Sequence, residues 1–347
     1  MDVARFSDRA ARDSREVLTG EAAVTALDTA GFWAVVVSFE GAVTAVRFET
    51  VTLLERRDEG AADPVPWSPL SGGWVSSLDR AEYVAAVHEV RRRIAAGSVY
   101  QANICRVLGH PLPADADLDG LDALLRQGNP APHASRIRVE AAGLDLVCAS
   151  PELFLSRTGR RLVSSPIKGT ATRPGTMLVK DYAENVMIVD LVRNDLSHVC
   201  REGTIDVEAL CTMVEHPGLS HLESTVAGEL RSDVGWEAIL DATFPPGSVT
   251  GAPKSSAVTT VRDLETAARG PYCGAIGWVD ADRREARLAV GIRTFWADHD
   301  DFGQRWLRFG TGAGITWGSD PEGEWQETVL KASRLVGLAS GRVPAGP

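Results

Sequence analysis

Segments that favour strands and segments that favour helices come in blocks along this chain and do not alternate strictly. Apolar and β-branched runs predict two or three strands within 31–57 and further strands at 99–108, 144–150, 152–157, 272–280, 286–296 and 305–316. Apolar residues at helical spacing predict helices at 77–97, 176–199, 235–242, 254–268 and 321–338. This block order is typical of an α+β fold, in which sheets pack against helices, and it disfavours a doubly wound parallel sheet.

A Pro-, Gly- and Ser-rich passage at 61–74 is the best candidate for a boundary within the chain. It separates a β-rich N-terminal region, residues 1–75, from a main region, residues 76–340. No low-complexity tract is long enough to act as a flexible linker, and no internal repeat is present. We therefore expect both regions to belong to the same fold.

Charge and cysteine content limit the possible partners and compartment. The formal net charge of −11 argues against nucleic acid or an anionic membrane as a partner, because both bind basic surfaces. An acidic small molecule is still possible, since an anion site can be built locally. No apolar run approaches the ~20 residues needed to cross a bilayer, and residues 1–20 are too polar for a secretory signal. The cysteines are scattered without C-x-x-C spacing, so we expect reduced thiols in a cytoplasmic protein.

Two predicted helices each contain a pair of carboxylates at i, i+3 spacing, which places both side chains on one helix face. The pairs are Asp181 with Glu184 and Glu324 with Glu327. Two such faces can hold a hard divalent cation together with waters and a substrate oxygen, as Mg²⁺ prefers. Acidic pairs are also common on solvated helix faces, and the spacing alone leaves both interpretations open.

Glycine-rich segments and isolated polar residues are further candidates. The segments 244–256 and 309–316 can bring backbone N–H groups close to an anion, although tight turns have the same composition. Glu152 heads a predicted strand and suits a general acid if burial raises its pKa. Arg293, in a predicted strand, suits a bidentate grip on a carboxylate. The polar residues within or beside apolar runs, each of which can also be a satisfied core group, are His221, Tyr272, Arg293 and Lys331.

Lysine is rare in this chain and occupies only four of the 36 Lys and Arg positions, at 168, 180, 254 and 331. A chain so rich in arginine tends to keep lysine where a guanidinium cannot replace it. An amine that loses its proton is a nucleophile or base, whereas a guanidinium stays charged. Lys168, between an apolar pair and a Gly-Thr turn in SSPIKGTATRPG, is therefore a candidate nucleophile. The alternative is a surface lysine in a turn.

An ordered series of motifs runs through residues 77–338: SVYQANI, SPELFL, PIKGTATR, AENVMIVDLVRNDL, FPPGSVTGAPK, RGPYCGAIG, GIRTF and GTGAGITWGSDPEGEWQETVLKA. The series resembles the chorismate-utilising enzymes, which include the large subunits of anthranilate and aminodeoxychorismate synthases and the isochorismate and salicylate synthases. The resemblance implies the chorismate-binding fold, in which two antiparallel β-sheets pack together and helices flank them. It also implies that residues 76–340 form the catalytic domain. Residues 1–75 would be a shortened form of the region that helps to build a tryptophan pocket in longer relatives.

The resemblance implies roles for individual residues. Glu184 and Glu327 would bind Mg²⁺ directly, with Asp181 and Glu324 acting through water. Glu152 would protonate the leaving hydroxyl group of chorismate. The residues implied in contacting the substrate are Tyr272 and Arg293 at the enolpyruvyl carboxylate, Gly312, Ala313, Gly314 and Lys331 at the ring carboxylate, His221 near the ring, and Thr170 and Ser248 along the pocket.

Two positions distinguish branches of this family. Gln101 stands where isochorismate and salicylate synthases have a lysine base, and Lys168 stands where anthranilate synthases typically have alanine. The lysine form is similar to aminodeoxychorismate synthase component I, in which the amine is proposed to attack ring carbon 2 while the 4-hydroxyl group leaves. The resemblance therefore implies Mg²⁺-dependent amination of chorismate at carbon 4. The product would be 4-amino-4-deoxychorismate, a precursor of 4-aminobenzoate for folate or a related metabolite.

The resemblance further implies that ammonia comes from a separate glutamine amidotransferase subunit. We expect neither nucleic acid nor a membrane as a partner. Three alternatives stay open: anthranilate synthase component I, 2-amino-2-deoxyisochorismate synthase, and a catalytically silent chorismate-binding paralogue. The metal carboxylates, Lys168 and Arg293 argue against the silent paralogue.

Overall fold

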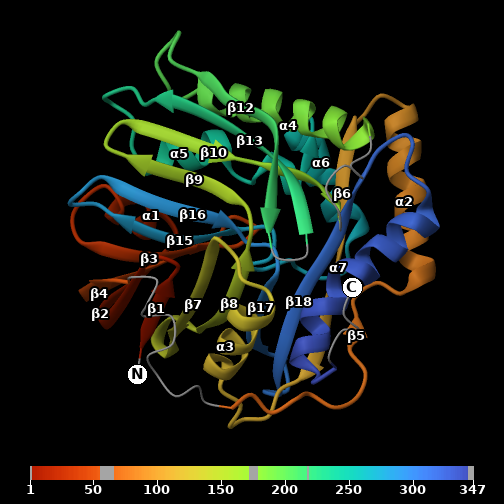
Figure 1. The fold of residues 1–347 in the computed structure, drawn as a ribbon, viewed down its shortest axis with the longest axis horizontal. Coiled ribbons are helices and arrows are strands. Elements are labelled where there is room, and N and C mark those ends of the chain that lie inside the picture. Colours follow the sequence, from red (N-terminus) through yellow and green to blue (C-terminus); the bar gives the residue numbers. More distant parts are fainter. Residues whose placement is uncertain (1, 55–65, 172–178, 217–218, 343–347) are drawn as a thin grey trace.

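The computed structural model describes residues 2–54, 66–171, 179–216 and 219–342, and it shows antiparallel β-structure with helices on the outside (Figure 1). The strands are β1 Val3–Phe6, β2 Arg9–Thr19, β3 Phe32–Val37, β4 Val43–Leu53, β5 Val75–Ser76, β6 Gln101–Pro111, β7 His133–Val139, β8 Leu144–Ser150, β9 Leu153–Thr158, β10 Arg161–Ser165, β11 Ile167–Ala171, β12 Asp206–His216, β13 Leu219–Glu229, β14 Gly251–Ala252, β15 Ala275–Asp280, β16 Glu285–Val290, β17 Thr294–His299 and β18 Arg305–Ile315. The helices are α1 Gly20–Ala26, α2 Arg80–Ala95, α3 Leu118–Gly128, α4 Val179–Ser197, α5 Trp236–Thr243, α6 Lys254–Leu264 and α7 Pro321–Ala339, with short 3-10 turns η2 Glu140–Ala142 and η3 Gly247–Val249.

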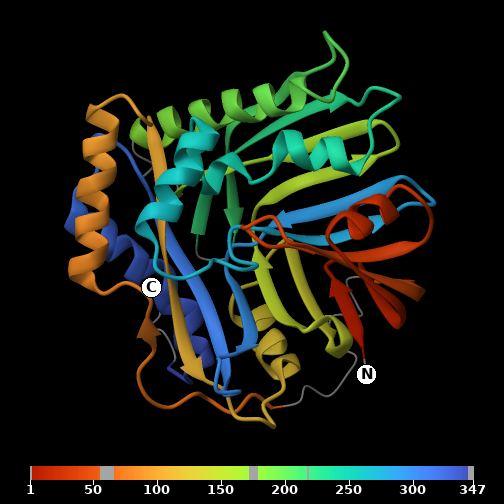
Figure 2. The same cartoon turned by 180° about the vertical axis from the view of Figure 1, so that it is seen from behind.

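The strands pair in one continuous antiparallel series. The order is β6, β18, β17, β8, β7, β1, β2, β4, β3, β15, β16, β9, β10, β13 and β12, while β5 and β14 flank β6 and β11 pairs with β13. The strands β6 and β18 run steeply in Figures 1 and 2, and β16, β9 and β10 run across them. The expected α+β fold with antiparallel sheets and flanking helices is confirmed. The two sheets are the two halves of this single series: one contains β6, β18, β17 and β8, and the other contains β16, β9, β10, β13 and β12.

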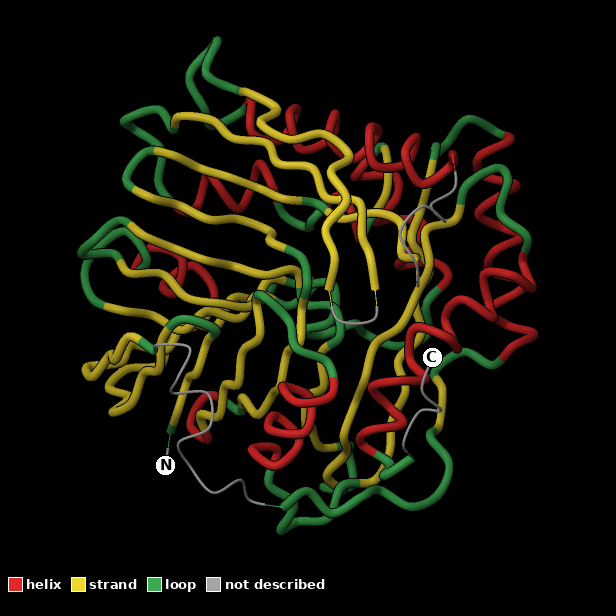
Figure 3. The backbone as a smooth tube through the Cα atoms, in the orientation of Figure 1, coloured by secondary structure: helices red, strands yellow, loops and turns green. Residues whose placement is uncertain are grey.

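Helices cover the outer faces of both halves (Figure 3). The helix α4 packs on β11, β12 and β13, whereas α2 and α7 pack on each other and on β6 and β18. The largest buried apolar cluster joins side chains from both halves, among them Cys105 in β6, Leu146 in β8, Leu155 in β9 and Trp278 in β15. Burial of this surface from both directions is the main force that holds the halves together.

Local capping explains why two predicted helices form where the sequence places them. The Asp79 side chain accepts from the backbone N–H of Glu82 at 2.8 Å, and the Glu82 side chain accepts from the backbone N–H of Asp79 at 2.8 Å. This reciprocal capping box starts α2. At α7 the Asp320 side chain accepts from the N–H of Gly323, and Pro321 stands at the first helical position. The predictions at 77–97 and 321–338 are thus confirmed with small shifts at the ends.

Several elements are absent from the sequence prediction. They are α1, α3, β1, β2, β5, β7, β10, β11, β14 and the hairpin of β12 and β13. The hairpin strand β12 exposes alternate residues and breaks its register at Cys211, where φ is 50°. Such an irregular, half-exposed strand gives little of the apolar periodicity on which the prediction depends.

The N-terminal strands belong to the same series as the rest of the chain, because β1 pairs with β7 and β3 pairs with β15. The predicted boundary passage at 61–74 lies partly outside the described residues, and the division at residue 75 stays a prediction. No helix in the described part of the chain is long and apolar enough to span a membrane.

The chain passes between the two halves at two neighbouring crossings. β8 leads into β9 through Pro151 and Glu152, and β16 leads into β17 through residues 291–293. Backbone hydrogen bonds join the crossings, from Ala149 N to Arg293 O at 3.0 Å and from Val290 N to Glu152 O at 3.1 Å. Glu152 and Arg293 are therefore both fixed at the junction of the halves.

The second crossing corrects the prediction of one strand at 286–296. This segment forms two strands, and Arg293 lies between them with φ of 54° instead of within a strand. The prediction is wrong here because the backbone must leave one half of the series for the other at this point. The left-handed conformation turns the chain and costs a non-glycine residue strain energy.

Close packing at the junction gives a test of the fold. A Cβ atom added at Gly310 would lie 2.0 Å from Cγ of the buried Tyr272 ring, so we expect Gly310→Ala to lower the free energy of unfolding by about 1–3 kcal/mol. The control is Gly318→Ala, because a Cβ there meets nothing within 4 Å. Urea unfolding of both variants checks this, and equal stability of the two would contradict the packing described here.

Candidate active site

One edge of β18 is open where the two halves separate. β17 pairs with β18 only as far as Phe309, whereas β6 pairs with it as far as Ile315. Among the described strands, none pairs with the second edge of residues 310–315. This edge lies beside the crossing that contains Arg293.

The open edge presents backbone groups of Gly312 and Gly314. Their partners on β6 are Cys105 and Asn103, whose N–H groups donate elsewhere, to Glu265 Oε1 at 2.8 Å and to Thr250 O at 2.9 Å. In an antiparallel ladder, such non-hydrogen-bonded pairs direct their backbone groups away from the partner strand. The N–H groups of both glycines therefore point to the open edge. The same alternation directs the N–H of Ala313 toward β6, so this amide is not available to a ligand.

Lys168 lies in β11, and its amine is held by the turn η3. Lys168 Nζ donates to the backbone carbonyl of Ser248 at 2.8 Å. Burial lowers the pKa of this amine, while the negative charges of Glu184 and Glu152 oppose that shift. Desolvation of a lysine beside carboxylates is the setting in which its neutral, nucleophilic form becomes accessible.

The pKa of Glu152 is shifted upward, whereas that of Lys168 is shifted downward. The Glu152 side chain is only 3% exposed, and burial raises the pKa of its carboxyl group to about 7 against the hydrogen bond from Ser248 and the charge of Lys168. A substantial fraction is therefore protonated near neutral pH, as a general acid requires.

Ser248 links these two groups. Its carbonyl accepts from Lys168 Nζ at 2.8 Å and from Asn103 Nδ2 at 3.1 Å, and its side chain lies close enough to Glu152 to oppose the rise in the pKa of that carboxyl group. Asn103 was not singled out by the sequence, although it belongs to the motif SVYQANI. In the neighbouring Gln101, Nε2 donates to Asn103 Oδ1 at 3.3 Å.

Cationic groups lie on another side of the site. Arg293 Nη2 is 3.4 Å from His221 Nε2, and His221 Nδ1 is 3.3 Å from Gly169 O. Burial lowers the pKa of Arg293 to about 10, with a smaller effect from Arg334, so the guanidinium is still charged at neutral pH. Lys331 Nζ donates to Gly312 O at 3.1 Å and pairs with Glu327 at 2.7 Å. Two cations and the glycine amides suit a substrate with two carboxylates.

The four predicted metal carboxylates lie on α4 and α7. The negative charges of Glu184 on α4 and Glu327 on α7 both raise the pKa of the Lys168 amine, so both carboxylates lie near this amine. Within the described ranges no group of three or more His, Cys, Asp and Glu is close enough to hold a metal ion. Two carboxylates with waters and a substrate oxygen still match the oxygen donors that Mg²⁺ prefers. The donor chemistry therefore fits this cation. Asp181 and the buried Glu324, each three residues before one of these two glutamates, are the predicted outer carboxylates.

Two predicted substrate residues have a less direct placement. The Tyr272 ring packs against Gly310, and burial raises the pKa of its hydroxyl group well above the usual value, with a further rise from the nearby Cys105. Its predicted contact with a carboxylate stays a prediction. Thr170 lies opposite His221 in the pairing of β11 with β13, and its side chain lies outside the described residues.

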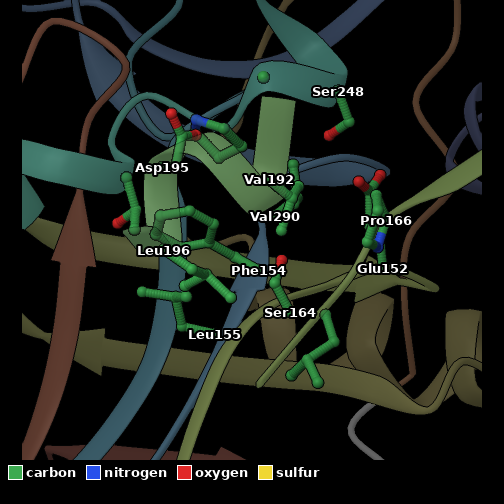
Figure 4. A pocket seen from close by; sticks show the side chains of 14 residues that line it. Glu152, Phe154, Leu155, Ser164, Pro166, Val192, Asp195, Leu196, Ser248 and Val290 are labelled. Atoms are coloured by element: carbon green, nitrogen blue, oxygen red, sulfur yellow. The ribbon is translucent and has the colours of Figure 1, made fainter. Parts of the chain in front are cut away.

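A small cavity behind Glu152 and Ser248 is separate from the open edge of β18. It has a volume of about 20 Å³ and lies between these residues and Asp195 (Figure 4). This space holds about one water molecule, so it is too small for a ring-shaped substrate. A larger groove of about 580 Å³ beside α1 contains none of the predicted site residues.

The raised pKa of Glu152 predicts a pH dependence of stability. Folding favours the protonated carboxyl group, so its contribution is complete below the ordinary value of 4.5 and is lost as the pH rises through about 7. Between pH 5 and pH 8 we expect the wild type to lose about 3 kcal/mol more unfolding free energy than Glu152→Gln. Glu237→Gln, on the exposed face of α5, should follow the wild type. Parallel stability curves for wild type and Glu152→Gln in urea titrations would rule out the perturbed carboxyl group.

Comparison with known proteins shows the family of this chain. A family model described as chorismate binding enzyme matches residues 37–337. An anthranilate synthase component 1 of Haloarcula marismortui is 35% identical over 291 residues, which cover 80% of this chain and 57% of that protein. An aminodeoxychorismate synthase component 1 of Bacillus subtilis is 32% identical over 274 residues, 76% of this chain and 56% of that protein. The chain thus spans little more than half the length of these curated relatives.

Solved structures show the same fold. An anthranilate synthase component I of Streptococcus pneumoniae superposes with a TM-score of 0.81 at 20% identity, over 96% of this chain and 92% of that one. A putative 2,3-dihydroxybenzoate-specific isochorismate synthase of Bacillus anthracis gives a TM-score of 0.80 at 22% identity, over 98% of this chain and 96% of that one. With the family match over residues 37–337, these findings show that the chain belongs to the family of chorismate binding enzymes.

Proposed function

We propose that this protein is an aminodeoxychorismate synthase component I, which aminates chorismate at carbon 4 with ammonia and Mg²⁺. The observation that supports this most is that Lys168, whose amine donates to the Ser248 carbonyl, and Glu152 lie close enough for the charge of each to shift the pKa of the other. Burial shifts both groups toward their reactive forms, a neutral amine and a protonated carboxyl group. An alanine at 168 would supply no such amine.

In the proposed reaction the Lys168 amine attacks ring carbon 2. Both conjugated ring double bonds shift by one position, the bond from carbon 4 to its hydroxyl group breaks, and Glu152 supplies the proton with which water leaves. Ammonia then attacks carbon 4, both double bonds shift back, and the carbon–nitrogen bond to Lys168 breaks, which releases the neutral amine. The proton lost by the new ammonium group returns to Glu152. Chorismate and ammonia thus give 4-amino-4-deoxychorismate and water, and both side chains are regenerated.

The other site groups would orient the substrate. Arg293 and Lys331, with the open N–H groups of Gly312 and Gly314, would bind the two carboxylates of chorismate. Glu184 and Glu327 would hold Mg²⁺, with Asp181 and Glu324 supporting them through water. When bound, Mg²⁺ supplies positive charge that polarises substrate oxygens. Ammonia would come from a separate glutamine amidotransferase, as the component names of the relatives suggest.

Anthranilate synthase component I is the second candidate. It is favoured by the name that most of the similar curated relatives bear. A 2-amino-2-deoxyisochorismate synthase would use the same substrate and ammonia. These candidates differ from our proposal in the ring carbon that receives nitrogen, and a silent paralogue would form no product at all.

The product identifies the reaction. We expect purified protein with chorismate, Mg²⁺ and ammonium to form an amine that an added aminodeoxychorismate lyase converts to 4-aminobenzoate. Lys168→Ala and Lys168→Arg should each lose at least about 10³-fold in turnover, because neither provides a neutral amine. Chromatography with mass detection follows both steps. Anthranilate as the product, or full activity of Lys168→Arg, would refute the proposal.

The metal carboxylates give a second test. Glu327→Gln should raise the Mg²⁺ concentration for half-maximal activity about 10-fold or more, because it removes one charged oxygen donor. The matched control is Glu322→Gln on the same helix, whose exposed side chain pairs with Arg80 at 2.7 Å. Mg²⁺ titrations of activity compare the two variants. An unchanged titration for Glu327→Gln would exclude it as a ligand.

A further inference from the structure

A buried ion pair lies directly behind the segments that form the site. Arg269 and Glu265 have side chains only 1% and 6% exposed, and their charged groups approach to 2.6 Å. The guanidinium also lies 4.1 Å from the centre of the Phe39 ring. Arg269 belongs to the motif RGPYCGAIG, but none of the proposed catalytic steps uses it.

The pair connects two backbone segments. Arg269 Nη2 donates to the carbonyl of Asn103 in β6 at 2.9 Å, and Nη1 donates to the carbonyl of Val249 in η3 at 3.0 Å. Glu265 Oε1 accepts from the N–H of Cys105 at 2.8 Å. The planar fork of an arginine can reach both carbonyls at once, whereas the single ammonium of a lysine cannot keep this geometry.

These two segments converge on Ser248. Val249 follows Ser248 in the chain, and Asn103 Nδ2 donates to the Ser248 carbonyl at 3.1 Å. Arg269 thus fixes Ser248 from both sides, through the next carbonyl of η3 and through the backbone of Asn103. Ser248 in turn holds the Lys168 amine through its carbonyl, and Ser248 and Glu152 line the same small cavity.

We propose that the Arg269–Glu265 pair is the positioning element of this active site, which fixes Ser248 so that the Lys168 amine and the Glu152 carboxyl group face the same substrate. The naming of these two groups as the reacting ones rests on the proposed function. A buried ion pair is costly to desolvate and is often replaceable by apolar residues without loss of stability. Its hydrogen bonds to two site segments give it a role beyond stability.

The test measures the Lys168 amine directly. Brief acetylation with acetic anhydride across a pH series, followed by peptide mass spectrometry, gives the pH midpoint at which Lys168 becomes reactive. The chain's four lysines make this peptide easy to assign. In Arg269→Lys we expect the midpoint to rise by about one unit toward the ordinary value, because a displaced Ser248 admits water to the amine.

The matched control is Arg136→Lys. Arg136 in β7 is also an almost fully buried arginine, 2% exposed and paired with Asp119 at 2.6 Å and Asp145 at 2.7 Å, but it makes no contact with the site segments. This variant should lose stability without moving the Lys168 midpoint. If Arg269→Lys does not fold, the double variant Arg269→Gln with Glu265→Gln replaces the ion pair by neutral amides and serves in its place. A midpoint equal to that of the wild type in the folded variant overturns the positioning role.

Turnover separates this inference from the proposed function. We expect kcat of Arg269→Lys to fall by about 10²-fold with KM changed by less than about threefold, since the loss is one of alignment. If the wild type makes a product other than 4-amino-4-deoxychorismate while the midpoint still moves, the positioning role stands and the proposed reaction fails. If the wild type aminates carbon 4 and neither kcat nor the midpoint changes in the variant, the positioning role alone fails.

Discussion

Burial of a lysine amine beside a carboxyl group is the interaction on which this active site depends. Water would leave Lys168 charged and Glu152 ionised, and both would then be unreactive in the proposed step. The junction of the two sheet halves removes that water, and the Ser248 carbonyl holds the amine. Backbone hydrogen bonds join the two crossings that carry Glu152 and Arg293, so the connection between the halves also positions these residues.

The sequence was most informative where local chemistry determines the outcome. The capped helices α2 and α7 and the lone lysine in PIKGTATR follow from neighbouring residues, and the structure places that lysine half-buried with its amine against the Ser248 carbonyl. Arg293 was misplaced within a strand, because the turn at this residue is imposed by the distant pairing of β16 with β9 and β17 with β8. Asn103 and Arg269 were missed for the same reason, since their importance comes from contacts with residues more than 100 positions away.

The comparison with relatives shows why the fold alone does not give the reaction. Proteins named anthranilate synthase and isochorismate synthase share this architecture with TM-scores of 0.80 or more. A shared scaffold supports different chemistry through changes at a few site positions. Our proposal of amination at carbon 4 rests on Lys168 and Gln101, and the turn at Ser248 with the buried Arg269 contacts the segments that hold Lys168.

The most direct test of the account is to look for the covalent intermediate on Lys168. Protein incubated with chorismate and Mg²⁺ in the absence of ammonia would be quenched, digested and mapped by mass spectrometry. We expect a mass gain equal to chorismate minus water on the peptide that contains Lys168, absent from Glu152→Gln and lost when ammonium is added before the quench. An unmodified Lys168 in a preparation that forms product rapidly with ammonium would contradict it.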